Sequence, residues 1–141
     1  MANTTTLTII KPKSIQKNFH GAIINEILEN GFKIKAMKMV QMTNSQAEKF
    51  YEVHHDKPFY KDLTEFMSSS PVIVAILEAP NAVESFREFI GATNPDKAAE
   101  GTIRDKFGSS ITQNAVHGSD SNENATKEAD FFFSKLERFN Y

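Results

Sequence analysis

The sequence contains no cysteine, which excludes disulfide bonds and thiolate metal ligands and fits a reducing compartment. It also has no excess of positive charge, since 16 lysine and arginine residues are outnumbered by 18 aspartate and glutamate residues, a net charge of −2. The chain as a whole therefore lacks the basic character of a nucleic-acid-binding protein. A few locally placed cations could still hold a small anionic ligand.

Long apolar runs are missing as well. No stretch approaches the ~18 consecutive apolar residues of a membrane-spanning helix. The first ten residues, MANTTTLTII, lack the basic start and long apolar stretch of a secretory signal. We therefore expect a cytoplasmic protein without a membrane segment.

The composition that is present is that of a globular protein. The chain has 141 residues, of which 40% are hydrophobic and 24% are charged. A chain of this length is expected to form one domain, which we place at residues 1–141.

The pattern of apolar residues predicts an alternation of strands and helices. Four segments are typical of strands, with a bulge expected in the second and both faces of the third expected to be covered: 7–11, 32–41, 71–78 and 111–116. Five segments are typical of helices, the third of which begins at Pro58: 20–30, 43–51, 58–67, 81–91 and 121–133. Residues 92–110 show no clear periodicity and are expected to form a long loop.

Without the helices at 43–51 and 58–67, the order is strand-helix-strand followed by strand-helix-strand. This order predicts an α+β fold, a ferredoxin-like βαββαβ sandwich with additional helices. We expect a four-stranded antiparallel sheet with the helices on one face.

One short stretch, NAVHGSDS at residues 114–121, has the character of a reactive site. An apolar approach leads to His117, and Gly118 is expected to give the backbone room to turn and to allow close approach. Asp120 or Ser121 can cap the following helix, whose first amides would then offer a site for an anion. The imidazole could serve as a nucleophile, as an acid or base, or as a hydrogen-bond donor.

Glu128 lies at the edge of the apolar stripe that Ala125, Ala129 and Phe132 form on the last helix. An inward carboxylate is costly unless it is paired, and the polar turn at His117 and Ser119 is its natural partner. Such a partner would fix the tautomer of the imidazole and stabilise positive charge on it. The alternative is a solvated glutamate on an ordinary amphipathic helix.

Several other polar residues could together bind a polyphosphate. Lys11 lies at a strand end, Arg87 lies beside the apolar stripe of its helix, and Arg104 and Thr93 lie in the long loop. Guanidinium groups match the geometry of phosphate oxygens. Taken singly, each charge is more often an ordinary exposed one.

These segments together resemble the nucleoside diphosphate kinase family. The resemblance rests on IKP, FYEVHHDKPFY, FREFIGATNP, GTIR and NAVHGSDS with Glu128, in that order and over essentially the whole chain. It implies a ping-pong exchange in which a nucleoside triphosphate, such as ATP, transfers its γ-phosphoryl to the pros nitrogen of His117. A nucleoside diphosphate then takes the phosphoryl group, and Mg²⁺ is carried by the nucleotide phosphates.

The resemblance also implies a role for each site residue. Phe59 would stack on the base with Ile111 on its other side, and Lys11 and Asn114 would hold ribose hydroxyls, Lys11 also the terminal phosphate. Arg87, Thr93, Arg104 and His54 would bind phosphates. Tyr51 would lie beside the transferred group, while Ser119 and Glu128 would support His117. Members form homo-oligomers, and the short tail after Phe133 favours a tetramer over a hexamer.

Three features depart from a simple transfer of the family pattern. Lys13 and Lys57 stand where the family often has aspartate and arginine. In addition, strand alternation would place Asn114 and His117 on opposite faces of the sheet. The fourth strand must therefore end or twist before His117 if both residues are to reach one nucleotide.

Two other classes of function remain open. A catalytically silent ferredoxin-like module could bind nucleotides or act in regulation, whereas an RNA-binding sheet would need an RNP1-like stretch that the sequence lacks. A metal site could use His54, His55, Asp56 and His117. Adjacent histidines on a strand would point apart, which argues against it.

Overall fold

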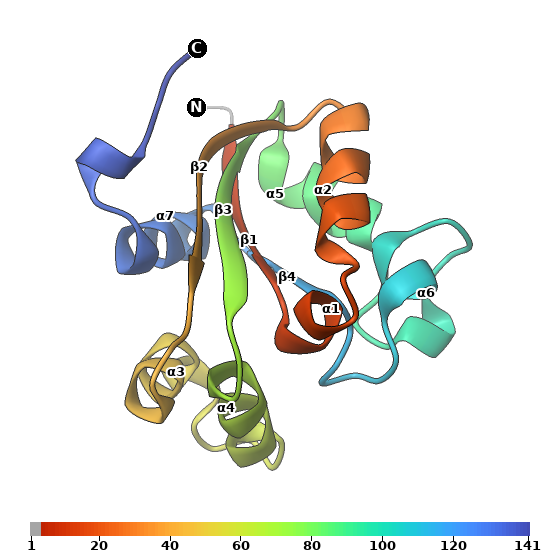
Figure 1. Ribbon diagram of the computed structural model, residues 1–141, viewed down its shortest axis with the longest axis vertical. Coiled ribbons are helices and arrows are strands. Elements are labelled where there is room, and N and C mark those ends of the chain that lie inside the picture. Colours follow the sequence, from red (N-terminus) through yellow and green to blue (C-terminus); the bar gives the residue numbers. More distant parts are fainter. Residues whose placement is uncertain (1–3) are drawn as a thin grey trace.

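The computed structural model describes residues 4–141 and is built around one four-stranded antiparallel sheet (Figure 1). The strands are β1 (Thr5–Ile10), β2 (Lys33–Val40), β3 (Val72–Glu78) and β4 (Val116–Gly118), in the spatial order β2-β3-β1-β4. The two central strands, β1 and β3, pair from Thr5 opposite Glu78 to Ile10 opposite Ile73. The predicted antiparallel sheet is confirmed.

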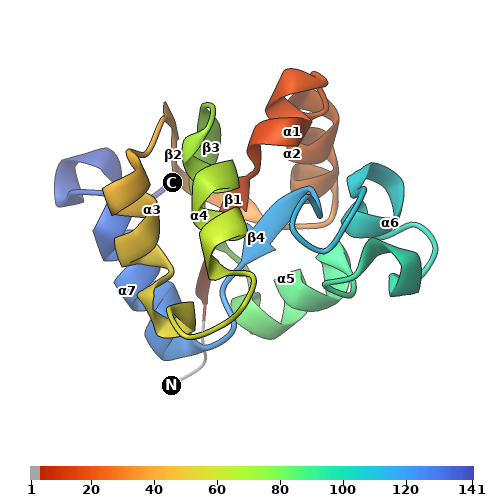
Figure 2. The same cartoon turned by 90° about the horizontal axis from the view of Figure 1, so that it is seen from below.

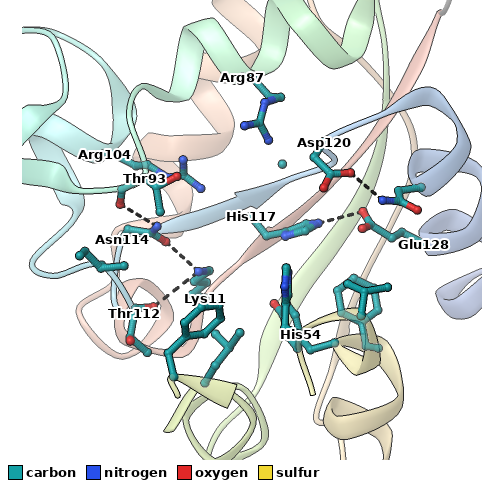
Figure 3. A pocket seen from close by; sticks show the side chains of 18 residues that line it. Lys11, His54, Arg87, Thr93, Arg104, Thr112, Asn114, His117, Asp120 and Glu128 are labelled. Atoms are coloured by element: carbon teal, nitrogen blue, oxygen red, sulfur yellow. Dashed lines mark hydrogen bonds and ion pairs between the residues drawn. The ribbon is translucent and has the colours of Figure 1, made fainter. Parts of the chain in front are cut away.

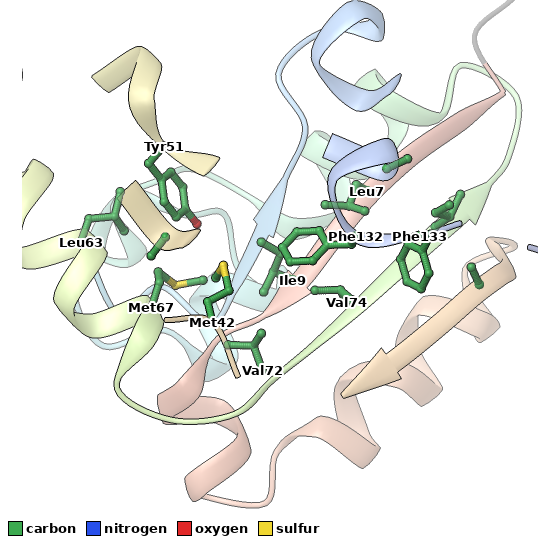
Figure 4. Packing of buried hydrophobic residues seen from close by; sticks show 14 residues of the cluster. Leu7, Ile9, Met42, Tyr51, Leu63, Met67, Val72, Val74, Phe132 and Phe133 are labelled. Carbon is green, nitrogen blue, oxygen red and sulfur yellow. The ribbon is translucent and has the colours of Figure 1, made fainter. Parts of the chain in front are cut away.

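Both faces of the sheet are buried at its central strands, which carry apolar residues on both sides. In β3, Val72, Val74 and Ile76 belong to one core cluster, and Ile73, Ala75 and Leu77 belong to the other. Helices α2 (His20–Glu29) and α5 (Ala82–Ile90) cover the second face. Helices α3 (Asn44–Phe50), α4 (Tyr60–Ser68) and α7 (Asn122–Phe132) cover the first (Figures 1 and 4). The expectation that the helices lie on one face was wrong, since α3, α4 and α7 form a second layer.

Local signals in the sequence account for several of these elements. Thr43 and Gln46 form the expected capping box at the start of α3, with bonds of 3.1 and 2.9 Å. The expected bulge in β2 lies between Ile34 and Ala36, where the register against β3 shifts. Gly91 ends α5 with a φ of +92°, a conformation that other residues rarely adopt.

Short helices were missed or misplaced by the sequence analysis. Pro12 stops β1 and opens α1 (Pro12–Gln16), while Pro58 lies outside α4, which begins only at Tyr60. The expected loop at 92–110 contains the 3₁₀ helix η2 (Pro95–Lys97) and α6 (Ile103–Phe107), so Arg104 is helical. Elements of three to five residues are too short to show a helical period. Two further 3₁₀ helices are η1 (Glu52–His54) and η3 (Lys135–Glu137).

The fourth strand lies further along the chain than predicted. Residues 111–115 are irregular, Ala115 has a φ of +78°, and β4 begins only at Val116. His117 is therefore the middle residue of β4, opposite Ile9 of β1. The positive φ at Ala115 breaks the strand alternation between Asn114 and His117. Seen from below, β4 emerges between α4 and α6 (Figure 2).

None of the helices in residues 4–141 has the length and apolar character needed to cross a membrane.

Substitution of Gly91 is expected to destabilise the link between α5 and α6. A Cβ at this position would lie 2.5 Å from Thr102 Oγ1, and the backbone has a positive φ. We expect Gly91→Ala to lower the free energy of unfolding by about 2–3 kcal/mol in urea titrations. Gly21, on the exposed side of α2, has open space around the same position and serves as the control. Gly21→Ala should leave stability unchanged or raise it by up to about 1 kcal/mol. Equal losses in the two variants would contradict the assigned role of Gly91.

Candidate active site

A cavity of about 330 Å³ opens where β4 meets α3, α4, α5, α6 and α7. All the site residues expected from the sequence line it except Ser119, which is fully buried. Figure 3 shows Lys11 and Arg104 on one side of His117 and Glu128 on the other. Lining residues that the sequence analysis did not assign to the ligand site are Phe50, Val53, Leu63, Thr112, Gly118, Asp120 and Asn124.

The imidazole of His117 is held by a largely buried network. Its Nε2 lies 2.8 Å from Glu128 Oε1, and the hydroxyl of Ser119 donates to the same carboxylate oxygen over 2.7 Å (Figure 3). The backbone N–H of Leu7 donates to Ser119 Oγ over 3.2 Å. The expected pairing of Glu128 with His117 and Ser119 is confirmed, and the alternative of a solvated glutamate was wrong. Because Glu128 occupies Nε2, Nδ1 is the ring nitrogen left for chemistry.

Of the two roles expected for Gly118, the structure supports the close approach but not the turn. It lies in β4 opposite Thr8, so it does not turn the backbone. A Cβ on Gly118 would lie 3.0 Å from Ile90 Cδ1 and 3.1 Å from Phe86 Cδ2. Its lack of a side chain therefore lets β4 pack closely against α5, which fixes the strand that carries His117.

The start of α7 is capped by Ser121. Its hydroxyl accepts a 3.1 Å hydrogen bond from the backbone N–H of Asn124. Asp120, the other expected cap, instead accepts a 2.7 Å bond from the side-chain amide of Asn124. Both Asp120 and Asn124 line the cavity, so this pair forms part of its wall beside His117.

Lys11 is buried at the end of β1 and is part of a chain of polar side chains. Its ammonium donates to Asn114 Oδ1 over 2.7 Å, and the Asn114 amide donates to the carbonyl of Thr93 over 2.9 Å. Burial, with a smaller contribution from the charge of Arg104, lowers the pKa of Lys11 to about 7. Near neutral pH this group is therefore poised between its charged and neutral forms.

Arg104 is the second buried cation. Its guanidinium donates to the carbonyls of Gly91 and Val116 over 3.1 and 2.9 Å, and its Nε has no partner among residues 4–141. Burial and the nearby charge of Arg87 lower the pKa of Arg104 to about 10, so it stays positive at neutral pH. Such a cation suits an anionic ligand.

The hydroxyl of Tyr51 is also buried, and the described part of the chain offers it no hydrogen-bond partner. Burial, followed by the charge of Glu128, raises the pKa of Tyr51, which keeps the hydroxyl protonated and able to donate. A buried donor without a partner is costly. Together with Arg104, it suits a ligand that brings acceptor oxygens into the cavity.

Apolar side chains form the outer part of the cavity. Phe59 and Ile111 are 43% and 58% exposed although both are large and apolar. The ring of His54 lies 5.6 Å from that of Phe59. An exposed aromatic ring at the mouth of a polar cavity is suited to stacking on a flat ring system.

The proposed metal cluster is not assembled. His54 lines the cavity in η1, whereas Nδ1 of His55 lies 2.9 Å from the carbonyl oxygen of Glu52. Within residues 4–141 no group of three histidine, aspartate or glutamate side chains is arranged to hold a metal ion. Lys13 and Lys57, the two departures in the sequence, do not line the cavity of the described chain.

Comparison with known proteins gives one consistent result. A family model described as nucleoside diphosphate kinase matches residues 4–138. The nucleoside diphosphate kinase of Flavobacterium psychrophilum is 56% identical over 139 residues, which cover 99% of this chain and 100% of that protein. The corresponding protein of Salinibacter ruber is 53% identical over 137 residues, covering 97% and 96% of the two chains.

Solved structures agree with these sequence relatives. The Aquifex aeolicus nucleoside diphosphate kinase superimposes with a TM-score of 0.93 at 44% identity, covering 95% of this chain and 97% of that one. A halophilic nucleoside diphosphate kinase from Halobacterium salinarum, in complex with CDP, gives a TM-score of 0.93 at 31% identity and covers 97% and 91%.

The lowered pKa of Lys11 predicts that binding of a phosphate ligand takes up a proton. A bound anion favours the ammonium form and raises the pKa above about 7, so affinity should fall as the pH rises from 7. At pH 8, calorimetry of MgADP binding in buffers with different ionisation enthalpies should show close to one more proton taken up by the wild type than by Lys11→Gln. The same uptake in both proteins would contradict this assignment.

Proposed function

The chain belongs to the nucleoside diphosphate kinase family and is a nucleoside-diphosphate kinase, and from that premise we propose how its residues carry out the reaction. His117 accepts the γ-phosphoryl of a nucleoside triphosphate on Nδ1 and then passes it to a nucleoside diphosphate. The observation that carries this proposal is the bond between Glu128 and His117 Nε2, which leaves Nδ1 free beside a cationic cavity.

In the first half-reaction, the lone pair of Nδ1 forms a bond to the γ-phosphorus. The bond from that phosphorus to the bridging oxygen breaks, and its electrons leave with the nucleoside diphosphate. The imidazole gains positive charge, which the carboxylate of Glu128 stabilises through the proton on Nε2. In the second half-reaction, a terminal oxygen of the other diphosphate attacks the phosphohistidine and restores the neutral ring.

Phosphoryl transfer needs little from the protein besides positioning and stabilisation of charge. We assign the phosphates to Arg87, Arg104 and Thr93, with a further contribution from His54, all of which line the cavity. Lys11 holds the terminal phosphate in its ammonium form, and the Tyr51 hydroxyl donates to the group in transfer. Ser119 acts from behind, because its bond to Glu128 orients the carboxylate.

The nucleoside is assigned to the outer part of the cavity. Phe59 stacks on the base, with Ile111 on the other side, and Lys11 and Asn114 hold ribose hydroxyls. Stacking uses the face of the base and reads no hydrogen-bonding edge. We therefore propose broad tolerance, with ATP and other nucleoside tri- and diphosphates as substrates. A relative in this family was solved with CDP.

The family generally uses magnesium nucleotides, and the lining residues fit a Mg²⁺ ion that the nucleotide phosphates carry. Lys11, Arg87 and Arg104 suit phosphate oxygens rather than a metal ion. Glu128 is already engaged by His117 and Ser119. When bound, the ion would neutralise phosphate charge, and no protein side chain is assigned as its ligand.

Three further properties belong to the same proposal. Residues 1–141 act as one domain, in the cytoplasm, and the protein forms a homo-oligomer, with a tetramer favoured over a hexamer. Support for association comes from β2, an edge strand of the described sheet on which Met37 and Met39 are 48% and 56% exposed.

The proposal predicts that ATP alone phosphorylates the protein on His117. Incubation with MgATP should give one acid-labile, base-stable label per chain, and added CDP should convert that label into CTP. His117→Ala should lose both the label and the exchange while keeping its melting temperature. A label that survives acid, or exchange by the variant, would sink the assignment. A catalytically silent module would give no CTP even with the wild type.

A further inference from the structure

The ring of His117 has an aromatic neighbour that hydrogen bonding does not explain. Phe50, the last residue of α3, places its ring centroid 5.6 Å from that of His117, with the planes at 72°. Tyr51 lies further from the imidazole, at 6.3 Å. Phe50 has no polar group that could bind phosphate, so its place beside the reacting ring must serve another purpose than ligand binding.

Phe50 is itself held firmly. Its ring lies 5.3 Å from Phe131 and 5.2 Å from Phe132, both on α7, and 4.8 Å from the neighbouring Tyr51. It packs against the core cluster on this face of the sheet while one side borders the cavity. A ring fixed by three others offers a rigid wall to a fourth.

The same helix thus contacts the imidazole by two routes. Glu128 of α7 reaches Nε2 directly over 2.8 Å, and Phe131 and Phe132 of α7 back the Phe50 ring. A single hydrogen bond fixes one atom of the ring and still allows the plane to tilt. Contact with a fixed neighbouring ring restricts that tilt, and catalytic groups need their orientation held within about 10–20°.

We propose that Phe50 is a positioning residue for phosphoryl transfer, which holds the imidazole of His117 at the tilt where Glu128 meets Nε2 and Nδ1 is presented to the γ-phosphate. The inference rests on the proposed role of His117 as the phosphoryl acceptor. It assigns to Phe50 an effect on the rate of the chemical step and none on nucleotide affinity.

The test compares Phe50→Ala and Phe50→Leu with Phe66→Ala. Leucine keeps much of the apolar volume but has no ring, so it separates ring contact from core filling. Phe66, on α4, packs against the same core cluster and does not border the cavity of the described chain, which makes it the matched control. His117→Ala is included to test the acceptor itself.

Single-turnover labelling at saturating MgATP should be slowed about tenfold in both Phe50 variants, the upper range for one aromatic contact. The affinity for MgADP should be unchanged, and Phe66→Ala should label at the wild-type rate. Nitrogen NMR of the His117 ring should show one fixed tautomer in the wild type and exchange-broadened ring signals in Phe50→Leu. A purely structural role would leave these ring signals as they are.

Three results would overturn the inference. Wild-type labelling by Phe50→Leu would mean that Phe50 only fills space. A loss of affinity with an unchanged rate would make it a ligand contact, and an equal slowing in Phe66→Ala would indicate general loosening of the core. Each of these leaves the proposed function intact, provided that His117→Ala takes no label. Labelling of His117→Ala would instead refute the proposed function.

Discussion

The contact between Glu128 and His117 is the constraint on which the rest of the site depends. A carboxylate that is largely removed from water is costly unless it is paired, and Glu128 is paired twice, by Nε2 of His117 and by the hydroxyl of Ser119. These bonds fix α7 against β4, and β4 in turn pairs with β1. The position of the imidazole is thus set by the sheet, and its orientation is set by the helix. The close approach of α5 at Gly118 secures the same strand from the other face.

The cavity beside this contact brings together the cations of Lys11, Arg87 and Arg104, whereas the two carboxylates that line it, Glu128 and Asp120, are bonded to other side chains. Lys11 and Arg104 are both buried, and in each case burial and a neighbouring arginine lower the pKa. Holding like charges together in a partly buried site costs stability. That cost is relieved when an anion enters, so part of the affinity for polyphosphate comes from the arrangement of the free protein. The hydroxyl of Tyr51 and the Nε of Arg104, which have no partner within residues 4–141, are likewise costly until a ligand brings acceptor oxygens.

The sequence predicted the parts of the site that depend on local pattern. The position of Glu128 at the edge of an apolar stripe predicted its contact with His117. The capping box at Thr43 and the bulge in β2 were also predicted correctly. The predicted position of β4 was wrong because Ala115 has a positive φ and the strand begins only after it. Alanine rarely adopts this conformation, so the sequence gives no sign of it. The second layer of helices was missed because only the apolar run of β3 indicated a strand covered on both faces.

Most of the assembly of the cavity could not be derived from the residues alone. Arg104 lies in a five-residue helix without detectable periodicity. Its guanidinium is held in the site by hydrogen bonds to the carbonyls of Gly91 and Val116, which are not its neighbours in the sequence. The resemblance to a family supplied that placement. Phe50 was missed because its place beside His117 depends on the packing of α3 against α7.

The central claim is that Glu128 selects the nitrogen that reacts by occupying the other one. It is tested most directly by NMR of the phosphorylated protein with nitrogen-labelled histidine, in which phosphorus coupling identifies the nitrogen that carries the phosphoryl group. The account predicts phosphorus on Nδ1 of His117 and a proton on Nε2. Phosphorus on Nε2 would contradict it, because Glu128 would then have to release the ring before transfer.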